Sequence, residues 1–162
     1  AHISFSHPIC PTLTSQVQSA ADNIEFPIKT GGTYVCMEGP AFSTLAESEL
    51  YRSWGADLIG MTNLQEAKLA REAEICYVTI AMVTDYDCWH EEEESVSVEM
   101  LIEYLTKNSE NAKRLIREVV KQAPKDCECS CQHALQSAII TNPSAIPEKT
   151  RQELDLIIGK YI

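Results

Sequence analysis

The stretch ICYVTIAMVTDYDCW, which spans Ile75 to Trp89, decides the fold that this sequence predicts. Its first part, Ile75 to Val83, is almost wholly apolar and rich in side chains that favour β-strands. Such a run is typical of a central strand that is covered on both faces of a sheet. The pattern changes abruptly at Thr84, where polar residues begin. We therefore predict a buried strand over Ile75 to Val83 that ends in a polar loop.

Two carboxylates, Asp85 and Asp87, follow that predicted strand at the rim of the sheet. Burial and mutual repulsion can raise the pKa of one carboxyl group enough for it to hold a proton near neutral pH. A protonated carboxyl group can donate a hydrogen bond to a leaving group, while an ionised neighbour can accept one from an amino group. The pair is therefore a candidate acid–base site, although both side chains could instead only cap the loop that follows.

Two further predicted strand ends carry residues that suit a binding site. Gly31 to Met37 is typical of a turn and a short strand, and it leads into EGPAF at Glu38 to Phe42. Asp57 to Met61 is typical of a short apolar strand, and Thr62 follows it. Phe42 could stack on a flat heterocycle or pack in the core. Thr62 could offer its hydroxyl and its backbone N–H to a phosphate, although a single threonine is a weak signal.

Helices are predicted between and after these strands. Apolar periodicity indicates the first helix and the long amphipathic helix near the middle of the chain. Capping-box spacing, Thr44 with Glu47 and Asn63 with Glu66, opens two others. The alternation predicts an α/β fold with a mixed central sheet flanked by helices, in which ligands bind beyond the strand ends. The predicted helices span Leu13 to Ala21, Thr44 to Ser53, Asn63 to Ala73, Val98 to Gln122, Cys131 to Ile139 and Pro147 to Ile158.

The composition limits the classes of partner. The chain has 162 residues, which suits a single domain, residues 1–162, with a real core. It carries 13 Lys and Arg against 24 Asp and Glu, a net charge of −11. This balance argues against nucleic acid, whose binding rests on Lys and Arg contacts to phosphate, but a small anion can be held by a few backbone donors. Because the sequence has no membrane-length apolar run and no signal-peptide pattern, we expect a cytoplasmic protein without a membrane partner.

The sequence holds seven cysteines. Four lie in apolar or mixed segments and are expected to be small buried side chains: Cys10, Cys36, Cys76 and Cys88. The others crowd into CECSC at residues 127–131, with His133 close behind. Zinc-binding pairs are typically about two to four residues apart, so the spacing of Cys127, Cys129 and Cys131 fits zinc poorly and we expect no metal. A local redox pair, a disulfide-bonded tail and free thiols remain open.

Longer motifs lie in a continuous order from His2 to about Leu115. They are HPICP (His7 to Pro11), EGPAFSTLAES (Glu38 to Ser48), YRSWGADLIGMT (Tyr51 to Thr62), EAKLAREAEICY (Glu66 to Tyr77), AMVTDYDCW (Ala81 to Trp89) and ESVSVE (Glu94 to Glu99). Together they resemble the C-terminal half of the 5'-methylthioadenosine phosphorylase branch of the trimeric purine nucleoside phosphorylases. Because no single short motif carries this likeness, it is specific, and it implies the C-terminal part of the nucleoside phosphorylase fold.

The resemblance implies an enzyme that cleaves a nucleoside with inorganic phosphate as co-substrate and without a cofactor. Phosphate attacks the anomeric carbon and adenine departs through an oxocarbenium-like transition state. By the resemblance, Asp85 hydrogen-bonds the imidazole nitrogen of the purine and assists its departure as an acid, while Asp87 recognises the 6-amino group. Members that act on 6-oxopurines carry asparagine at the position of Asp85, so a carboxylate there favours adenine-type nucleosides.

The resemblance also implies the remaining contacts to substrate. Phe42 packs against the base and Met61 against the ribose, while Thr62 contacts phosphate. Val98 and Leu101, on the first turn of the long helix, line the pocket for the alkylthio group. An apolar pocket at that position favours a methylthio substituent over a 5'-hydroxyl group.

Several features depart from the family pattern. Family members usually carry arginine at the positions of Ala41 and Leu45 and proline at Gln65, and we expect the loss of two cations to weaken catalysis or assembly. The phosphate-binding glycine-rich loop and first strands of the family would precede His2. Since half a sheet exposes apolar edges, we expect a separate chain or a cleaved segment to supply this N-terminal half. His2 matches a histidine that reaches into a neighbouring subunit's site, which implies a homotrimer or a dimer of trimers.

We therefore favour phosphorolysis of 5'-methylthioadenosine to adenine and 5-methylthioribose 1-phosphate, which requires the N-terminal half. One alternative is a purine nucleoside phosphorylase that acts on other 6-aminopurine nucleosides. Another is a non-catalytic purine-binding or assembly module. The replaced arginines support this last alternative, and the intact pair Asp85 and Asp87 argues against it.

Overall fold

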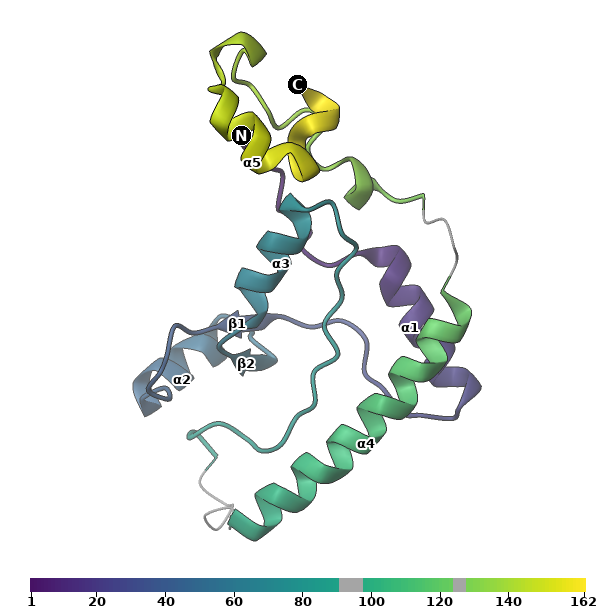
Figure 1. Ribbon diagram of the computed structural model, residues 1–162. Coiled ribbons are helices and arrows are strands. Elements are labelled where there is room, and N and C mark those ends of the chain that lie inside the picture. Colours follow the sequence, from purple (N-terminus) through teal and green to yellow (C-terminus); the bar gives the residue numbers. More distant parts are fainter. Residues whose placement is uncertain (91–97, 124–127) are drawn as a thin grey trace. The chain divides into compact units, whose positions relative to one another are not determined.

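The computed structural model describes residues 1–90, 98–123 and 128–162, without the side chains of residues 98 and 101. It forms two compact units, each described by itself: Ala1–Thr14, Gln65–Thr79 and Pro124–Ile162 make the first, and Ser15–Leu64 and Ile80–Ala123 make the second. Figure 1 labels the main elements. These are α1 (Pro11–Asn23), β1 (Tyr34–Cys36), α2 (Leu45–Ser53), β2 (Leu58–Gly60), α3 (Asn63–Glu72), α4 (Val98–Gln122) and α5 (Glu148–Ile158).

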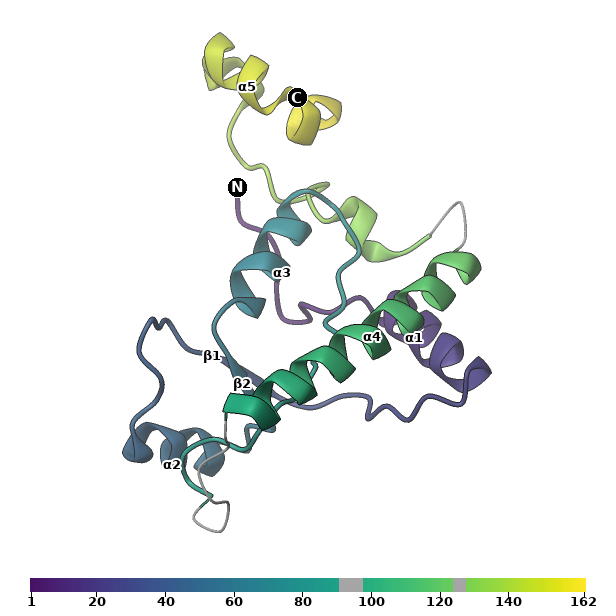
Figure 2. The same ribbon diagram turned by 60° about the horizontal axis from the view of Figure 1, so that its bottom comes forward.

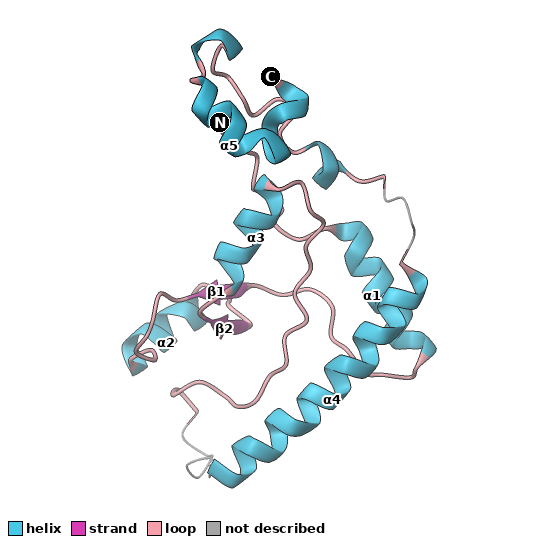
Figure 3. Ribbon diagram, in the orientation of Figure 1, coloured by secondary structure: helices cyan, strands magenta, loops and turns pink. Residues whose placement is uncertain are grey.

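The sheet of the second unit consists of two parallel strands. Tyr34 of β1 pairs with Leu58 of β2, and Cys36 pairs with Gly60. Both strands lie within the predicted ranges, and Figures 2 and 3 show them side by side. The connection between them carries α2, as expected for parallel strands that need a crossover. The two strands and the surrounding helices agree with the predicted α/β class.

The predicted strand over Ile75 to Val83 is wrong. This run is irregular in the structure and appears as a loop in Figure 3. A strand requires a neighbour that accepts and donates ladder hydrogen bonds, and an apolar, β-prone composition does not supply one. In the described residues the sheet contains β1 and β2 alone, so the mixed central sheet is not present there. Val83 instead offers its carbonyl to the side-chain amide of Asn108 on α4, at 3.0 Å.

Helix α2 begins where its capping box predicts. Thr44 Oγ1 accepts the backbone N–H of Glu47 at 3.3 Å, and Glu47 Oε2 accepts the backbone N–H of Thr44 at 2.8 Å. The Thr44 hydroxyl also donates to Glu47 Oε2 at 2.8 Å, and the hydrogen bonds that the Thr44 backbone and hydroxyl donate to this carboxylate lower the pKa of Glu47. Gly55 follows the last turn with a φ of 77°, a left-handed conformation that glycine adopts without strain. Sequence and structure therefore agree on both ends of this helix.

Helix α4 matches its predicted range, Val98 to Gln122. Leu115 on this helix is fully buried, and the Arg114 side chain donates to the carbonyl oxygen of Ile24 at 2.9 Å. No helix in the described ranges is both long enough and apolar enough to cross a membrane.

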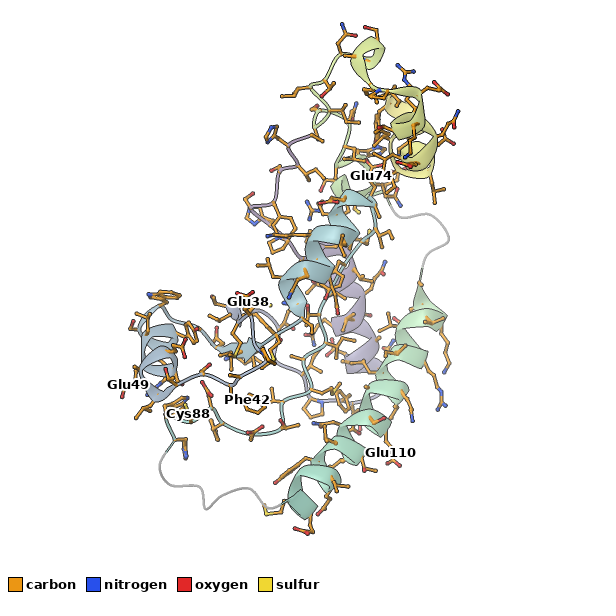
Figure 4. All side chains as sticks on the ribbon, turned by 60° about the vertical axis from the view of Figure 1, so that its left-hand side comes forward. Glu38, Phe42, Glu49, Glu74, Cys88 and Glu110 are labelled. Carbon is orange, nitrogen blue, oxygen red and sulfur yellow. The ribbon has the colours of Figure 1, made fainter. Side chains whose placement is uncertain are left out.

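In the first unit, Glu74 joins the end of α3 to the C-terminal segment, as Figure 4 shows. Its carboxylate accepts the backbone N–H of Leu135 at 2.9 Å and the hydroxyl of Tyr161 at 2.6 Å, and it pairs with Lys160 Nζ at 2.5 Å. Helix α5 lies within the predicted range, with Pro147 immediately before it. The helix predicted over Cys131 to Ile139 is shorter, a 3-10 turn over Ser130–His133 that continues as turns.

Candidate functional site

The segments that follow β1 and β2 meet in the second unit. Gly39, in the turn after β1, has a φ of 68°, and a Cβ atom at this position would lie 2.7 Å from Met61 Sδ. Glycine is therefore required for the turn to approach the half-buried Met61 so closely. The backbone N–H of Met37 also donates to the carbonyl of Gly60 at 2.9 Å. These contacts bring the predicted EGPAF turn against the residue predicted to face a ribose.

Phe42 lies at the end of this turn and is 86% exposed. Figure 4 shows it near Cys88, which belongs to the loop that carries the two aspartates. The alternative that Phe42 packs in the core is therefore wrong for this chain, and its ring face is free to stack on a flat molecule. Thr62, the predicted phosphate contact, is exposed between β2 and α3.

Helix α2 holds the loop at 84–90 in place. Ser48 on α2 is buried, and its Oγ donates to Asp87 Oδ2 at 2.6 Å, a short distance typical of a hydrogen bond to a carboxylate. The guanidinium of Arg52 lies 3.7 Å from the ring centre of Trp89, a cation–π contact. Cys88 Sγ lies 3.6 Å from the carbonyl oxygen of Ser43, beside Phe42. The loop is thus positioned by a helix and the EGPAF turn.

The two aspartates have different surroundings. Asp87 is half-buried, and the bond described for its carboxylate goes to α2 rather than to the loop that follows it. Asp85 is exposed, and its Oδ1 accepts the hydroxyl of Thr84. The strand that was expected to bury this pair is absent, so Asp85 is open to solvent in this chain. One carboxylate is therefore fixed, and the other can reach an incoming molecule.

Aromatic rings line the same loop. Tyr86 stacks on His90 with ring centres 4.5 Å apart, and Trp89 meets both rings at steep angles. Flat rings of this kind provide stacking surfaces for a heterocycle. The acidic run that follows, Glu91 to Glu94, lies outside the described residues.

Val98, Leu101 and His2 are the remaining predicted site residues. Helix α4 begins at Val98 as expected, but the side chains of Val98 and Leu101 lie outside the described part of the structure. His2 belongs to the first unit, where it is exposed and its backbone N–H donates to the carbonyl of Ala138 at 2.8 Å. It lines an open pocket of about 790 Å³ together with Arg71 and Leu154, and this pocket contains none of the other predicted residues.

Sequence analysis gave no role to Ser48, although this residue belongs to the quoted EGPAFSTLAES motif. The available signal was its spacing: Thr44, Ser48 and Arg52 recur every fourth residue and therefore share one helical face. In the structure two residues of that face, Ser48 and Arg52, contact the loop at 84–90. Polar side chains along one face of a short helix indicate that this face packs against a polar segment of the chain, which here is the loop at 84–90.

Comparisons with known proteins agree with one another. Residues 1–121 match the sequence profile of the phosphorylase superfamily. An S-methyl-5'-thioadenosine phosphorylase of Koribacter versatilis is 58% identical over 161 residues, which are 99% of this chain and 55% of the relative. A solved methylthioadenosine phosphorylase from an antarctic soil metagenomic library superposes with a TM-score of 0.88 at 44% identity, over 97% of this chain and 56% of that one.

A more distant solved structure is methylthioadenosine phosphorylase from Schistosoma mansoni in complex with adenine. Its TM-score is 0.73 at 29% identity, over 86% of this chain and 54% of that chain. This chain thus spans about half the length of the relatives that it matches.

Proposed function

Since this chain belongs to the phosphorylase superfamily, we propose that it supplies the purine-binding part of an enzyme that converts 5'-methylthioadenosine and phosphate to adenine and 5-methylthioribose 1-phosphate. The observation that carries this proposal is the bond from buried Ser48 to Asp87, because it fixes the aspartate loop beside the turn that ends in Phe42. The name of the Koribacter relative supports the choice of substrate.

In the proposed reaction, Asp87 accepts a hydrogen bond from the 6-amino group of the purine. Asp85 hydrogen-bonds the imidazole nitrogen of the purine and acts as an acid, passing a proton to that nitrogen as the bond between the purine and the anomeric carbon breaks. A phosphate oxygen forms the new bond to the anomeric carbon, so the electron pair of the old bond and the proton both leave with adenine. Phe42 covers the base, Met61 lies against the ribose, and Thr62 contacts phosphate.

Phosphate binding by this family is expected to require cationic side chains that this chain lacks at two positions. Ala41 and Leu45 are exposed and uncharged at positions where we expect arginine in the family, and the net charge of the chain is −11. We propose that the part of the protein corresponding to the rest of the relatives' length supplies the other phosphate contacts, as a separate chain or a cleaved segment. We further propose a cytoplasmic homotrimer or dimer of trimers, in which His2 reaches a neighbouring subunit's site.

Two alternatives stay open. The absence of cations at Ala41 and Leu45 favours a module that binds adenine without turnover, because phosphorolysis creates charge on phosphate that must be stabilised. Activity on other 6-aminopurine nucleosides is the second alternative, since the choice of a 5'-methylthio group rests on Val98 and Leu101, whose side chains the structure does not describe.

The test measures adenine release from 5'-methylthioadenosine, with and without phosphate, on the full-length protein. Phosphate-dependent release that is faster than release from adenosine supports the main proposal. Adenine binding without phosphate-dependent release supports the non-catalytic alternative, and equal rates with adenosine support the broader enzyme.

One substitution tests the role proposed for Asp85. The substitution Asp85→Asn replaces a group that suits 6-amino purines by one whose amide can donate to a 6-oxo group. We expect activity on 5'-methylthioadenosine to fall by roughly a hundredfold or more, the range of a lost general acid, and the preference to move toward inosine. Asp155→Asn, an exposed change on α5, serves as the control. An Asp85→Asn variant with unchanged substrate preference would contradict the assigned role.

A further inference from the structure

Four thiols converge in the first unit of the structure. The Sγ atoms of Cys10, Cys76, Cys129 and Cys131 all lie within 4.8 Å of one another. They come from three separate segments: the residue before α1, the irregular run after α3, and the segment around the 3-10 turn at Ser130–His133. Cys10 and Cys129 are 119 positions apart in sequence. Local spacing within CECSC therefore describes only part of the arrangement.

The separations suit one tetrahedral metal ion. Zinc–sulfur bonds of about 2.3 Å in tetrahedral geometry place thiolate sulfurs about 3.8 Å apart. Cys10 Sγ and Cys129 Sγ, at 3.9 Å, match this separation, whereas Cys76 Sγ and Cys129 Sγ, at 3.1 Å, lie closer than they would around a bound ion. An iron–sulfur cluster needs room for several irons and sulfides between its cysteines, which this group does not leave. A disulfide joins sulfurs at about 2.05 Å and would use the thiols in pairs only.

The four thiols are largely shielded from solvent. Cys10 and Cys131 are buried, with 0% and 2% exposure, while Cys76 and Cys129 are half-buried. Cys10 Sγ accepts the backbone N–H of Leu13 at 3.5 Å, in the first turn of α1, and its carbonyl accepts the backbone N–H of Thr14. Backbone donors at a helix start stabilise negative charge on sulfur, and such bonds orient metal ligands. The cysteines described outside this group, Cys36 and Cys88, belong to the other unit.

We propose that Cys10, Cys76, Cys129 and Cys131 bind one Zn²⁺ ion as a tetrathiolate site. Because all four coordination positions are taken by protein, the site is structural and not catalytic. It ties the N-terminal segment and the run after α3 to the C-terminal segment. Hydrogen bonds such as those of Glu74 and Arg71 also join these segments, but among the described residues of the first unit the other buried hydrophobic side chains are only Ala67, Leu135 and Ala138. A small core of this kind is commonly supplemented by a bound metal.

The experiment measures the metal content of the full-length protein, purified with a reductant and zinc-supplemented medium and then dialysed to remove loosely held ions. Elemental mass spectrometry is expected to give about one zinc per chain. Cys131→Ser and Cys76→Ser are expected to lose that zinc, while Cys88→Ser, an exposed thiol of the other unit, retains it. Replacement of zinc by Co²⁺ in the unaltered protein should give the visible and sulfur-to-metal bands of a tetrahedral tetrathiolate, which needs no variant to fold.

The outcomes separate the alternatives. Metal-free protein in which these four thiols react with a thiol reagent would overturn the proposal. So would metal-free protein whose intact mass is lower by the hydrogens lost to two disulfides. Zinc that persists undiminished in both Cys76→Ser and Cys131→Ser would place the metal elsewhere and would also overturn it.

Discussion

Ser48 illustrates how one small side chain can orient a reacting group. A hydroxyl buried as fully as this one is costly unless it is hydrogen-bonded, and here its partner is the carboxylate of Asp87. The hydrogen bond satisfies the hydroxyl and holds the Asp87 carboxylate against α2. Ser48 acts through Asp87 and does not itself touch substrate in the proposed reaction.

We therefore expect Ser48→Ala to lower kcat/KM for 5'-methylthioadenosine about tenfold or more, since a hydrogen bond to a charged group contributes roughly 1.5 to 3 kcal/mol. Ser53→Ala on the same helix is the matched control, because the Ser53 hydroxyl donates to the carbonyl of Leu50 and not to the loop. Steady-state kinetics at saturating phosphate compare the two variants. Equal rates for them would show that Asp87 does not need Ser48.

Ala41 offers the opposite kind of change, a gain of function. It is exposed in the turn that ends in Phe42, so a long side chain can be accommodated. Ala41→Arg should lower KM for phosphate several-fold, because a charge-assisted hydrogen bond to phosphate is stronger than a neutral one. Ala41→Gln, which is long and polar but uncharged, is the control. A phosphate KM that is the same in both variants would indicate that this turn lies away from the phosphate.

At the scale of elements, local signals predicted helices well and strands only in part. The capping box at Thr44 predicted the start of α2, and the apolar periodicity of residues 98–122 predicted α4. Each signal involves only residues near one another in sequence, and both helices have the expected bounds. The run Ile75 to Val83 has the composition of a strand but no strand pairing in the described residues. The family resemblance placed Phe42, Met61 and Asp87 in one site, but no local pattern showed that α2 holds the loop that carries Asp87.

The cap of α2 provides a test at this scale. Thr44→Ala removes one half of the capping box and should lower the free energy of unfolding by about 1 kcal/mol. Because α2 carries Ser48 and Arg52, fraying of its first turn should also lower kcat/KM. Thr44→Ser keeps the capping hydroxyl and should restore both quantities, as measured by urea unfolding and kinetics. Loss of activity in Thr44→Ser as well would point to a role of the threonine methyl group instead.

Glu74 connects α3 to the C-terminal segment and makes stability depend on pH. Burial disfavours its ionised form, but hydrogen bonds from Lys160, Tyr161 and the Leu135 N–H outweigh burial, so the pKa of Glu74 is below its ordinary value of 4.5. A carboxyl group whose pKa is lower in the folded state stabilises the fold while it is ionised. Its contribution is full above pH 4.5 and is lost as the pH falls through the folded-state pKa.

We expect Glu74→Gln to be less stable than the unaltered protein near neutral pH and to lose less further stability on acidification below pH 4.5. Urea unfolding at a series of pH values measures this difference. Glu72→Gln, an exposed change at the last residue of α3, should follow the unaltered protein throughout. Parallel pH curves for Glu74→Gln and Glu72→Gln would mean that the Glu74 network does not couple protonation to folding.

At the scale of the whole molecule, the thiol group shows what spacing rules cannot detect. The rules for zinc consider cysteines a few residues apart, and CECSC fits them poorly. Two of its cysteines meet Cys10 and Cys76, which are remote in sequence and were expected to be ordinary buried side chains. Only the tertiary structure brings such distant segments together. The sequence therefore showed the four cysteines but not that their thiols lie close to one another. Cys127 lies outside the described residues.

The balance of buried and exposed apolar groups leads to the last prediction. Among the described side chains, the buried hydrophobic set consists mainly of small residues, with Leu115, Leu135 and Val17 the larger members. Many large hydrophobic side chains are exposed, among them Leu156 at 99%, Ile140 at 75% and Val120 at 67%. Exposure on this scale is typical of a surface that another polypeptide covers. This chain also spans about half the length of its relatives.

We therefore expect the isolated 162-residue chain to bind a hydrophobic dye strongly and to lack phosphate-dependent adenine release. Addition of a polypeptide that corresponds to the part of the relatives that this chain does not match should lower dye binding and restore release together, because both effects are expected to depend on that part. Leu156→Gln, at a fully exposed position, tests whether a single apolar group accounts for the dye signal. Low dye binding by the isolated chain, with its activity intact, would show that residues 1–162 need no companion.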